Sequence, residues 1–139
     1  VYREEEREML PLCEDQGIGV IPWSPLARGF LAGNKKKDAE GETTRSRSDA
    51  MIKSMRIGQD ADYEVLAVVQ DIAKERGVTP AQIALAWVHH SPAVTSPIIG
   101  ASKMYQLDEA VAALDISLEV DEIARLKDVY VPHAVAGHR

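Results

Sequence analysis

Residues 17–29 read GIGVIPWSPLARG, and this stretch decides the fold class. Gly17 ends a helical pattern in the usual C-terminal manner. The apolar run at 19–22 is too short for a helix, so it predicts a buried strand. A helix, a tight glycine turn and a continuously apolar strand follow one another in this way in parallel α/β folds. We therefore expect an α/β chain.

The sequence on either side continues this alternation. Apolar spacing predicts a second strand at 94–100 and helices at 4–15, 63–76, 79–90, 104–114 and 121–129. Pro11 predicts that the first helix starts late or kinks, and Thr79 followed by Pro80 predicts a capped helix start. The polar stretch 34–62 predicts a long loop, with a helical turn near 50–55.

Composition limits the class of protein. The 139 residues suit one domain, and the net charge of −6 disfavours nucleic acid and anionic membrane surfaces as partners. No apolar run approaches the length of a membrane span. The single cysteine, Cys13, cannot form an internal disulfide, so we expect a reducing compartment, the cytoplasm. The first residue is Val1 and not Met, so we expect that the sequence begins inside a longer protein or that its start was removed.

A first candidate site follows the first predicted strand. Ligands of parallel α/β folds lie at the carboxyl ends of the strands. Trp23 offers a flat surface for a planar ring, and the residues after it allow backbone amides to approach phosphates. The alternative is that Trp23 belongs to the core and that Ser24 and Pro25 form a plain turn. The candidate residues are Trp23, Ser24, Pro25, Leu26, Ala27 and Arg28.

A second candidate site follows the second predicted strand and leads into a helix. Ser102 and Lys103 at a helix N-terminus suit an anion such as a phosphate. Gln106 and Glu109 lie one helical turn apart, so they share a face that could bind an adenine or ribose edge. The alternative is a plain N-cap at Ser102 with solvated polar residues behind it. The candidate residues are Gly100, Ser102, Lys103, Gln106 and Glu109.

Together these motifs resemble the aldo-keto reductase superfamily, in the branch near potassium-channel β subunits and bacterial aldo-keto reductases. GIGVIPWSPLARGFLAG at 17–33 is similar to the seventh strand and its loop. TPAQIALAWV at 79–88 is similar to the helix before strand eight, and SPIIGASKMYQLDEAVAAL at 96–114 to strand eight and its cofactor-binding helix. The segment 120–139 is similar to the final helix and tail of bacterial members, so the resemblance covers essentially the whole chain.

The resemblance implies an eight-stranded (β/α)8 TIM barrel, which needs about 250 residues. We therefore expect residues 1–139 to form the C-terminal part of such a barrel, with about two parallel strands, flanking helices and a cofactor-side loop at 34–62. A chain of this length cannot close the barrel alone. We expect it to associate with itself or with the missing half of the barrel.

The resemblance also implies an NADP(H)-dependent oxidoreductase that reduces an aldehyde or ketone to an alcohol. The alternatives are a non-catalytic dinucleotide-binding or regulatory module and a self-associating truncated half-barrel. The family's catalytic Asp, Tyr, Lys and His belong to the first half of the barrel, so we expect no catalytic residue in this chain. His89 and His90 are expected to compensate a helix dipole, and we expect no metal site.

Individual roles also come from the resemblance. Trp23 matches the aromatic that stacks on nicotinamide. Ala110 stands where many relatives have Asn, which predicts that one adenine hydrogen bond is missing. Arg45 resembles a loop arginine that clamps the phosphates, with Arg47 as the alternative. Pyrophosphate contacts match Ser24, Leu26 and Arg28, and contacts to the adenosine phosphate and adenine match Gly100, Ser102, Gln106 and Glu109.

Overall fold

The computed structural model describes residues 1–33 and 57–134. Most of the predicted loop 34–62, its helical turn near 50–55 and the arginine candidates Arg45 and Arg47 lie outside these residues. The described elements are η1 (Glu4–Glu6), α1 (Met9–Asp15), η2 (Ala27–Ala32), α4 (Asp60–Arg76), α5 (Pro80–His90), α6 (Met104–Ala112), η3 (Ala113–Asp115) and α7 (Val120–Asp128).

The helix expected at 4–15 is divided into η1 and α1. Pro11 is the third residue of α1, where a backbone amide has no partner within the helix, so proline is tolerated there. Gly17 follows with a positive φ of 65°. The prediction of a late start and of a glycine end is therefore confirmed.

Local sequence sets the bounds of α4 and α5. Gly77 ends α4 in the left-handed conformation, with φ 68°. The Thr79 hydroxyl accepts a bond from the Gln82 amide, and Gln82 Oε1 accepts one from the Thr79 amide, so the predicted cap of α5 is confirmed. One boundary was wrong. The loop predicted to end at residue 62 ends earlier, because α4 begins at Asp60.

The two predicted strands lie side by side in parallel, but as isolated bridges. Val20 pairs with Val94, and Trp23 pairs with Ile98. No regular strand occurs in residues 1–33 and 57–134. Pro22 and Pro97 lack amide donors, and each segment bonds to the other only in short stretches, so a continuous ladder does not form.

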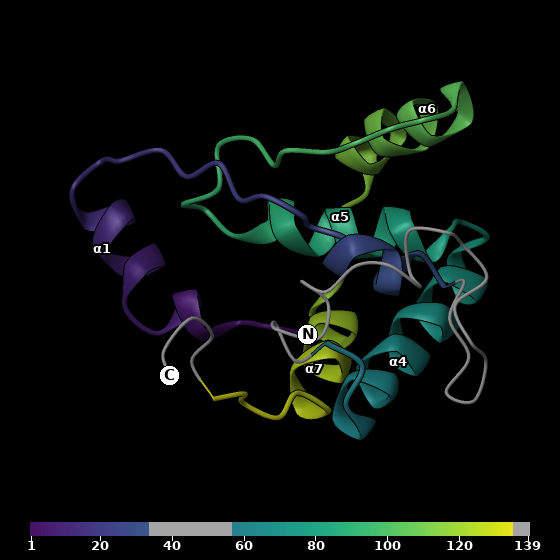
Figure 1. The fold of residues 1–139 in the computed structure, drawn as a ribbon, viewed down its shortest axis with the longest axis horizontal. Coiled ribbons are helices and arrows are strands. Elements are labelled where there is room, and N and C mark those ends of the chain that lie inside the picture. The colour runs from purple at the N-terminus through teal and green to yellow at the C-terminus, as the bar shows by residue number, and fades with distance from the viewer. Residues whose placement is uncertain (34–56, 135–139) are drawn as a thin grey trace.

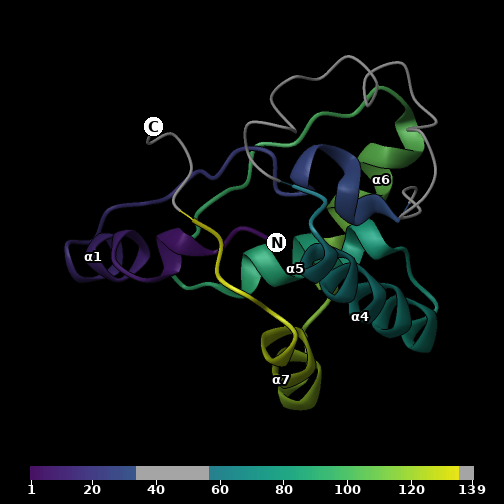
Figure 2. The same cartoon turned by 60° about the horizontal axis from the view of Figure 1, so that its bottom comes forward.

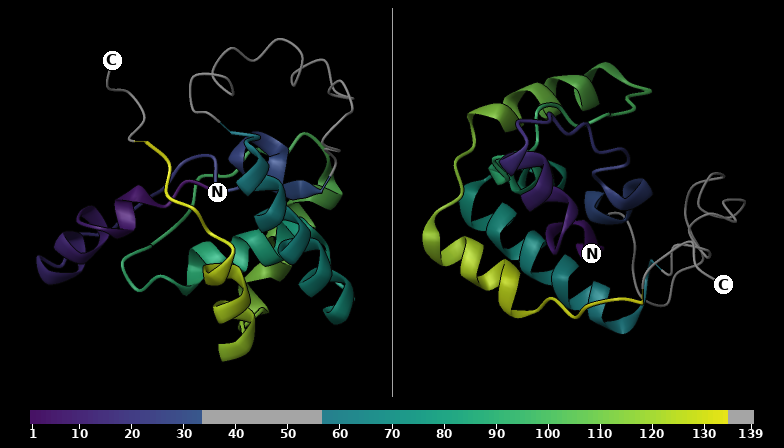
Figure 3. Two further views of the ribbon diagram at one scale, coloured as in Figure 1. Left: turned by 90° about the horizontal axis from the view of Figure 1, so that it is seen from below. Right: turned by 90° about the vertical axis from the view of Figure 1, so that its left-hand side faces the viewer.

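The core lies where η2, α4 and α5 meet, and Leu126 adds α7 to it. Ile72 of α4 and Ile83 of α5 are fully buried, and Phe30 of η2 is 1% exposed. The ring of Phe30 meets Tyr63 edge-on, with centroids 5.1 Å apart. In Figure 1, α5 lies between α6 on one side and α4 with α7 on the other. Figures 2 and 3 show that α1 projects away from this group of helices.

Two bidentate ion pairs connect α4 to α7. The Arg76 guanidinium bonds the Glu122 carboxylate, with Nη2 2.7 Å from Oε2, and Arg125 bonds Glu75 in the same way. The Arg76 side chain also donates to the Ser117 carbonyl at 2.9 Å. Glu122 is 6% exposed, whereas Glu75 lies at the surface. The Arg76–Glu122 pair is therefore the more shielded of the two.

Many large apolar side chains are exposed on the paired segments and on α6. Exposed apolar side chains that lie next to one another are typical of a face that another chain segment or a partner covers. On the paired segments these side chains are Ile18, Ile21, Trp23, Ile98 and Ile99, and on α6 they are Met104, Tyr105, Leu107 and Val111.

Candidate functional site

Parallel pairing brings the two candidate motifs to the same end of the molecule. The Thr95 amide donates to the Val20 carbonyl at 2.9 Å, and the Ile98 amide donates to the Pro22 carbonyl at 2.8 Å. Residues 23–29 therefore follow one paired segment where residues 100–103 follow the other. The two segments run side by side in Figure 1. This is the end at which parallel α/β folds bind ligands.

Trp23 lies at the edge of this end, and 55% of its surface is exposed. Its backbone forms the bridge to Ile98, so the position of the residue is fixed while its ring stays accessible. Among the residues that the structure describes, Trp23 lies outside the buried core cluster. An exposed indole on a fixed backbone offers a stacking surface for a planar ring.

The segment after Trp23 turns through left-handed conformations that sequence reasoning did not predict. Ser24, Ala27 and Arg28 have positive φ angles of 54°, 48° and 55°, and Gly29 has 88°. Each such L-residue costs about 1–2 kcal/mol. The Ser24 hydroxyl accepts a bond from the Arg28 amide at 3.1 Å, which closes the turn. Strain of this kind gathers at functional sites when the surroundings hold it in place.

Buried side chains hold this strained segment. Ala27, Phe30 and Leu31 are each at most 8% exposed and pack in the core with α4 and α5. Gly33 ends η2 with φ 82°, and a Cβ added there would lie 3.0 Å from Pro80 Cγ. The glycines at 29 and 33 were the only sequence signal for this geometry, and they do not reveal the left-handed residues before them.

The second motif converges on one oxygen atom. Gln106 Oε1 accepts bonds from the Ser102 amide at 2.8 Å, the Ser102 hydroxyl at 3.2 Å and the Lys103 amide at 3.2 Å. The N-cap of α6 is Lys103, so the alternative that placed it at Ser102 is wrong by one residue. Three donors directed at one acceptor form a geometry that also suits a phosphate oxygen.

The remaining residues of this motif differ in their surroundings. Glu109 is partly buried, and its Oε2 accepts a long bond of 3.4 Å from the Thr79 hydroxyl of α5. Gly100 is exposed, and no atom lies within 4 Å of a Cβ added there. Gln106 and Glu109 therefore both have partners within the protein, and a ligand that bound them would replace these contacts.

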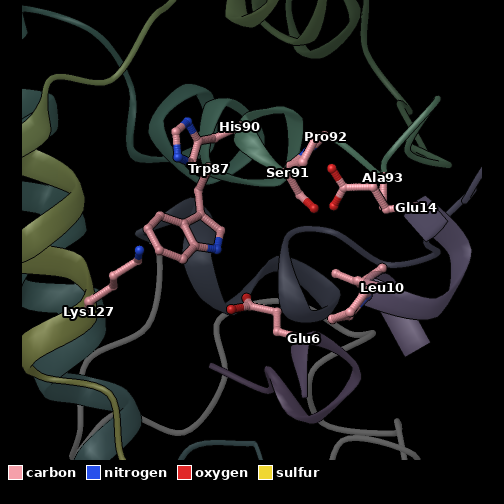
Figure 4. A pocket seen from close by; sticks show the side chains of 10 residues that line it. Glu6, Leu10, Glu14, Trp87, His90, Ser91, Pro92, Ala93 and Lys127 are labelled. Atoms are coloured by element: carbon pink, nitrogen blue, oxygen red, sulfur yellow. The ribbon is translucent and has the colours of Figure 1, made fainter. Parts of the chain in front are cut away.

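A pocket of about 260 Å³ lies away from both motifs, between α1, α5 and α7. Its wall includes Ser91, Pro92 and Ala93, which precede the second paired segment. Figure 4 shows Trp87 and His90 at this pocket with Lys127 nearby. The pocket is therefore at the starts of the paired segments, the end that parallel α/β folds do not use for ligands.

Residues 1–33 and 57–134 contain no group of three or more histidine, cysteine, aspartate or glutamate side chains placed to hold a metal ion. Across the same residues, no helix has both the length and the apolar character needed to cross a bilayer.

The amino-acid sequence that forms these two motifs is similar to that of known proteins. The family model of the aldo/keto reductase family matches residues 1–131. The chain belongs to the aldo/keto reductase family. The resemblance inferred from the two motifs is thus confirmed, and the family implies a (β/α)8 barrel.

Curated members of the family align along nearly the whole chain. A Schizosaccharomyces pombe protein that carries the name of an aryl-alcohol dehydrogenase is 41% identical over 99% of this chain and 38% of its own length. Versiconal hemiacetal acetate reductase of Aspergillus parasiticus is 39% identical over 97% of this chain and 39% of its own length. An aldo-keto reductase of Fusarium vanettenii is 37% identical over 99% of this chain and 36% of its own length. The chain therefore spans less than half the length of these relatives.

Proposed function

We propose that this chain supplies part of the cofactor site of an NADP(H)-dependent oxidoreductase that reduces an aldehyde or ketone to an alcohol. The observation that carries the proposal is the parallel pairing, which puts a left-handed loop and a set of converging donors at one end of the molecule. Family membership supports oxidoreductase chemistry. The finer architecture, the C-terminal part of a TIM barrel, belongs to the same proposal.

In this proposal the two motifs bind opposite ends of the dinucleotide. Trp23 stacks on the nicotinamide ring and fixes its plane, and the turn from Ser24 to Arg28 lies along the pyrophosphate. The donors of Ser102 and Lys103 bind the phosphate on the adenosine ribose, where a cation next to a helix N-terminus favours negative charge. Gln106 and Glu109 then bind the adenine edge after leaving their present partners.

When bound, the cofactor supplies a hydride to the carbonyl carbon of the substrate. The residues of this chain orient the nicotinamide for that transfer, and misplaced reactants cost rate. The acid that protonates the carbonyl oxygen is proposed to lie in the part of the protein outside this chain, as the resemblance implies. This chain therefore binds and positions, and it contributes no catalytic residue.

The test uses the natural-length protein that carries this chain. We expect it to oxidise NADPH only when an aldehyde or ketone is added, measured by the loss of NADPH absorbance. Binding of NADPH without turnover across a panel of aromatic and aliphatic carbonyls would support a non-catalytic binding module instead.

The 139-residue chain alone gives a second test. We expect no carbonyl reduction from it, because the acid and its lysine partner lie elsewhere. Steady turnover that scales with the amount of this chain, in material free of longer reductase, would contradict the assignment of its residues to binding only.

A further inference from the structure

Asp62, in the first turn of α4, is a carboxylate that is 1% exposed. Its Oδ2 accepts bonds from the Gly58 amide at 2.8 Å and from the Gln59 amide at 3.0 Å. These two residues are the ones that lead into α4. A single buried oxygen therefore fixes the backbone at the start of the helix, and a buried carboxylate needs such donors because burying a polar group without hydrogen bonds costs free energy.

The other oxygen of the same carboxylate binds the C-terminal tail. Asp62 Oδ1 lies 3.0 Å from Nε2 of His133, and the two side chains are 2% and 4% exposed. The neighbours of His133 in the tail, Val131, Pro132 and Ala134, are exposed. The imidazole is therefore the part of this stretch that enters the interior. In Figure 3, right, the tail passes beside the start of α4.

A second contact holds the tail just before His133. The Tyr130 hydroxyl accepts a bond from the Arg3 amide at 3.2 Å and donates one to Glu4 Oε1 at 3.2 Å. The Arg3 guanidinium lies 4.7 Å from the ring centroids of both Tyr130 and Trp87. The tail is thus fixed at Tyr130 by the N-terminal segment and at His133 by α4.

The contact with Asp62 also determines the hydrogen position on the imidazole. A carboxylate accepts, so Nε2 carries the hydrogen that faces Oδ1. The other nitrogen, Nδ1, is buried and has no hydrogen-bond partner among the described residues. Packing alone would not favour burying a polar ring with one unpartnered nitrogen. The contact of Nε2 with Asp62 Oδ1 gives the buried ring one polar partner.

We propose that Asp62 and His133 form a buried latch that fastens the C-terminal tail to the start of α4. Asp62 is the shared element, because one oxygen positions Gly58 and Gln59 while the other retains the tail. Asp62 is thus the positioning residue, and His133 is the group of the tail that it holds. The latch involves neither of the two cofactor motifs, and it goes beyond the proposed function because it requires no bound dinucleotide.

Limited proteolysis of the natural-length protein tests the latch. We expect His133→Gln to speed cleavage of the tail between residues 130 and 134 by about tenfold or more, the factor that corresponds to about 1.4 kcal/mol. His90→Gln is the matched control, because it makes the same change at an exposed histidine at the end of α5. Unchanged cleavage of the tail in His133→Gln would overturn the proposal.

Two further measurements separate a specific latch from general loosening. Asp62→Asn should speed hydrogen exchange at the Gly58 and Gln59 amides and also cleavage of the tail, and adding His133→Gln should not speed the cleavage further, because both changes break one contact. An additive effect on the tail would overturn the latch. Nitrogen NMR of the wild type should show a slowly exchanging imidazole hydrogen on Nε2 of His133, which a side chain held by packing alone would not require, and its absence would also count against the latch.

Discussion

At the scale of single residues, Ser102 and Lys103 are the residues proposed to bind the phosphate on the adenosine ribose. Their amides and the Ser102 hydroxyl converge on Gln106 Oε1, so an internal oxygen occupies the position proposed for a phosphate oxygen. The Lys103 side chain is exposed, which leaves its ammonium available to a ligand. The residue that distinguishes NADPH from NADH should therefore be Lys103.

We expect Lys103→Glu in the natural-length protein to weaken NADPH binding by about tenfold or more and to leave NADH binding nearly unchanged. The reason is that a charge-assisted bond to a phosphate contributes about 1.5–3 kcal/mol, and only NADPH carries that phosphate. Fluorescence titration with each cofactor measures the dissociation constants of NADPH and of NADH. Lys74→Glu is the control, because Lys74 is exposed near the end of α4 and outside both motifs. Equal losses for NADPH and NADH would refute this role.

At the scale of elements, the two paired segments approach each other closely at Gly19. A Cβ at this position would lie 2.6 Å from the Thr95 hydroxyl, closer than real contacts allow. We expect Gly19→Ala to lower the free energy of unfolding by about 1–3 kcal/mol, because the Thr95 side chain or one of the two segments must shift. Urea unfolding measures the change.

Gly100→Ala is the matched control for Gly19→Ala, since it adds the same methyl group to the other paired segment. Open space surrounds an added Cβ at Gly100. The two variants should therefore differ clearly in stability. If they unfold at the same urea concentration, Thr95 gives way without cost and the close approach at Gly19 is not important.

The contact between α4 and α7 should make stability depend on pH. The Arg76 guanidinium bonded to Glu122 lowers the pKa of that carboxyl from its ordinary value. A lowered folded-state pKa adds stability above the unfolded value of about 4.3, and this stability is lost as the pH falls through the folded-state pKa. Between pH about 5 and about 3, the wild type should therefore lose more unfolding free energy than Glu122→Gln. Glu64→Gln is the control, because it changes an exposed carboxylate on α4, and it should behave as the wild type. If unfolding free energy depends on pH in the same way in all three proteins, the Arg76–Glu122 pair contributes no stability.

At the scale of the whole molecule, the exposed apolar side chains of the paired segments and α6 need a cover. Trp23, Ile98 and Met104 are 55%, 52% and 69% exposed. Each paired segment also has a side on which its backbone is not bonded to the other segment, and an unsatisfied amide costs about 1–3 kcal/mol when buried. A small domain is stable by only about 5–15 kcal/mol.

We therefore expect the purified 139-residue chain to self-associate, or to pair with the rest of the barrel when both are mixed. Sedimentation measures the mass of the species in solution, and the mixture should sediment as a one-to-one complex. A monomeric chain with a cooperative thermal transition would show that these side chains do not require a partner. Lowering the protein concentration serves as the internal control, because self-association weakens on dilution.

The sequence predicted the helices well because each has a clear local cause. Thr79 with Gln82 starts α5, and Gly77 ends α4, since caps and left-handed glycines depend on few neighbours. The parallel pairing followed from the apolar run and the family resemblance. The left-handed turn at Ser24, Ala27 and Arg28 could not be predicted, because distant core residues impose it against local preference. The Asp62–His133 contact could not be predicted either, because no rule of sequence spacing connects the start of a helix to a distant C-terminal tail.

The left-handed turn also has a consequence for how this protein can change over generations or in the laboratory. Glycine would relieve the backbone strain at Arg28. A selection for heat resistance alone would therefore favour glycine at this position. The same exchange would delete a cation proposed to face the pyrophosphate. On that proposed role, a variant library at this codon should separate into more stable proteins that bind the cofactor weakly and less stable proteins that bind it well.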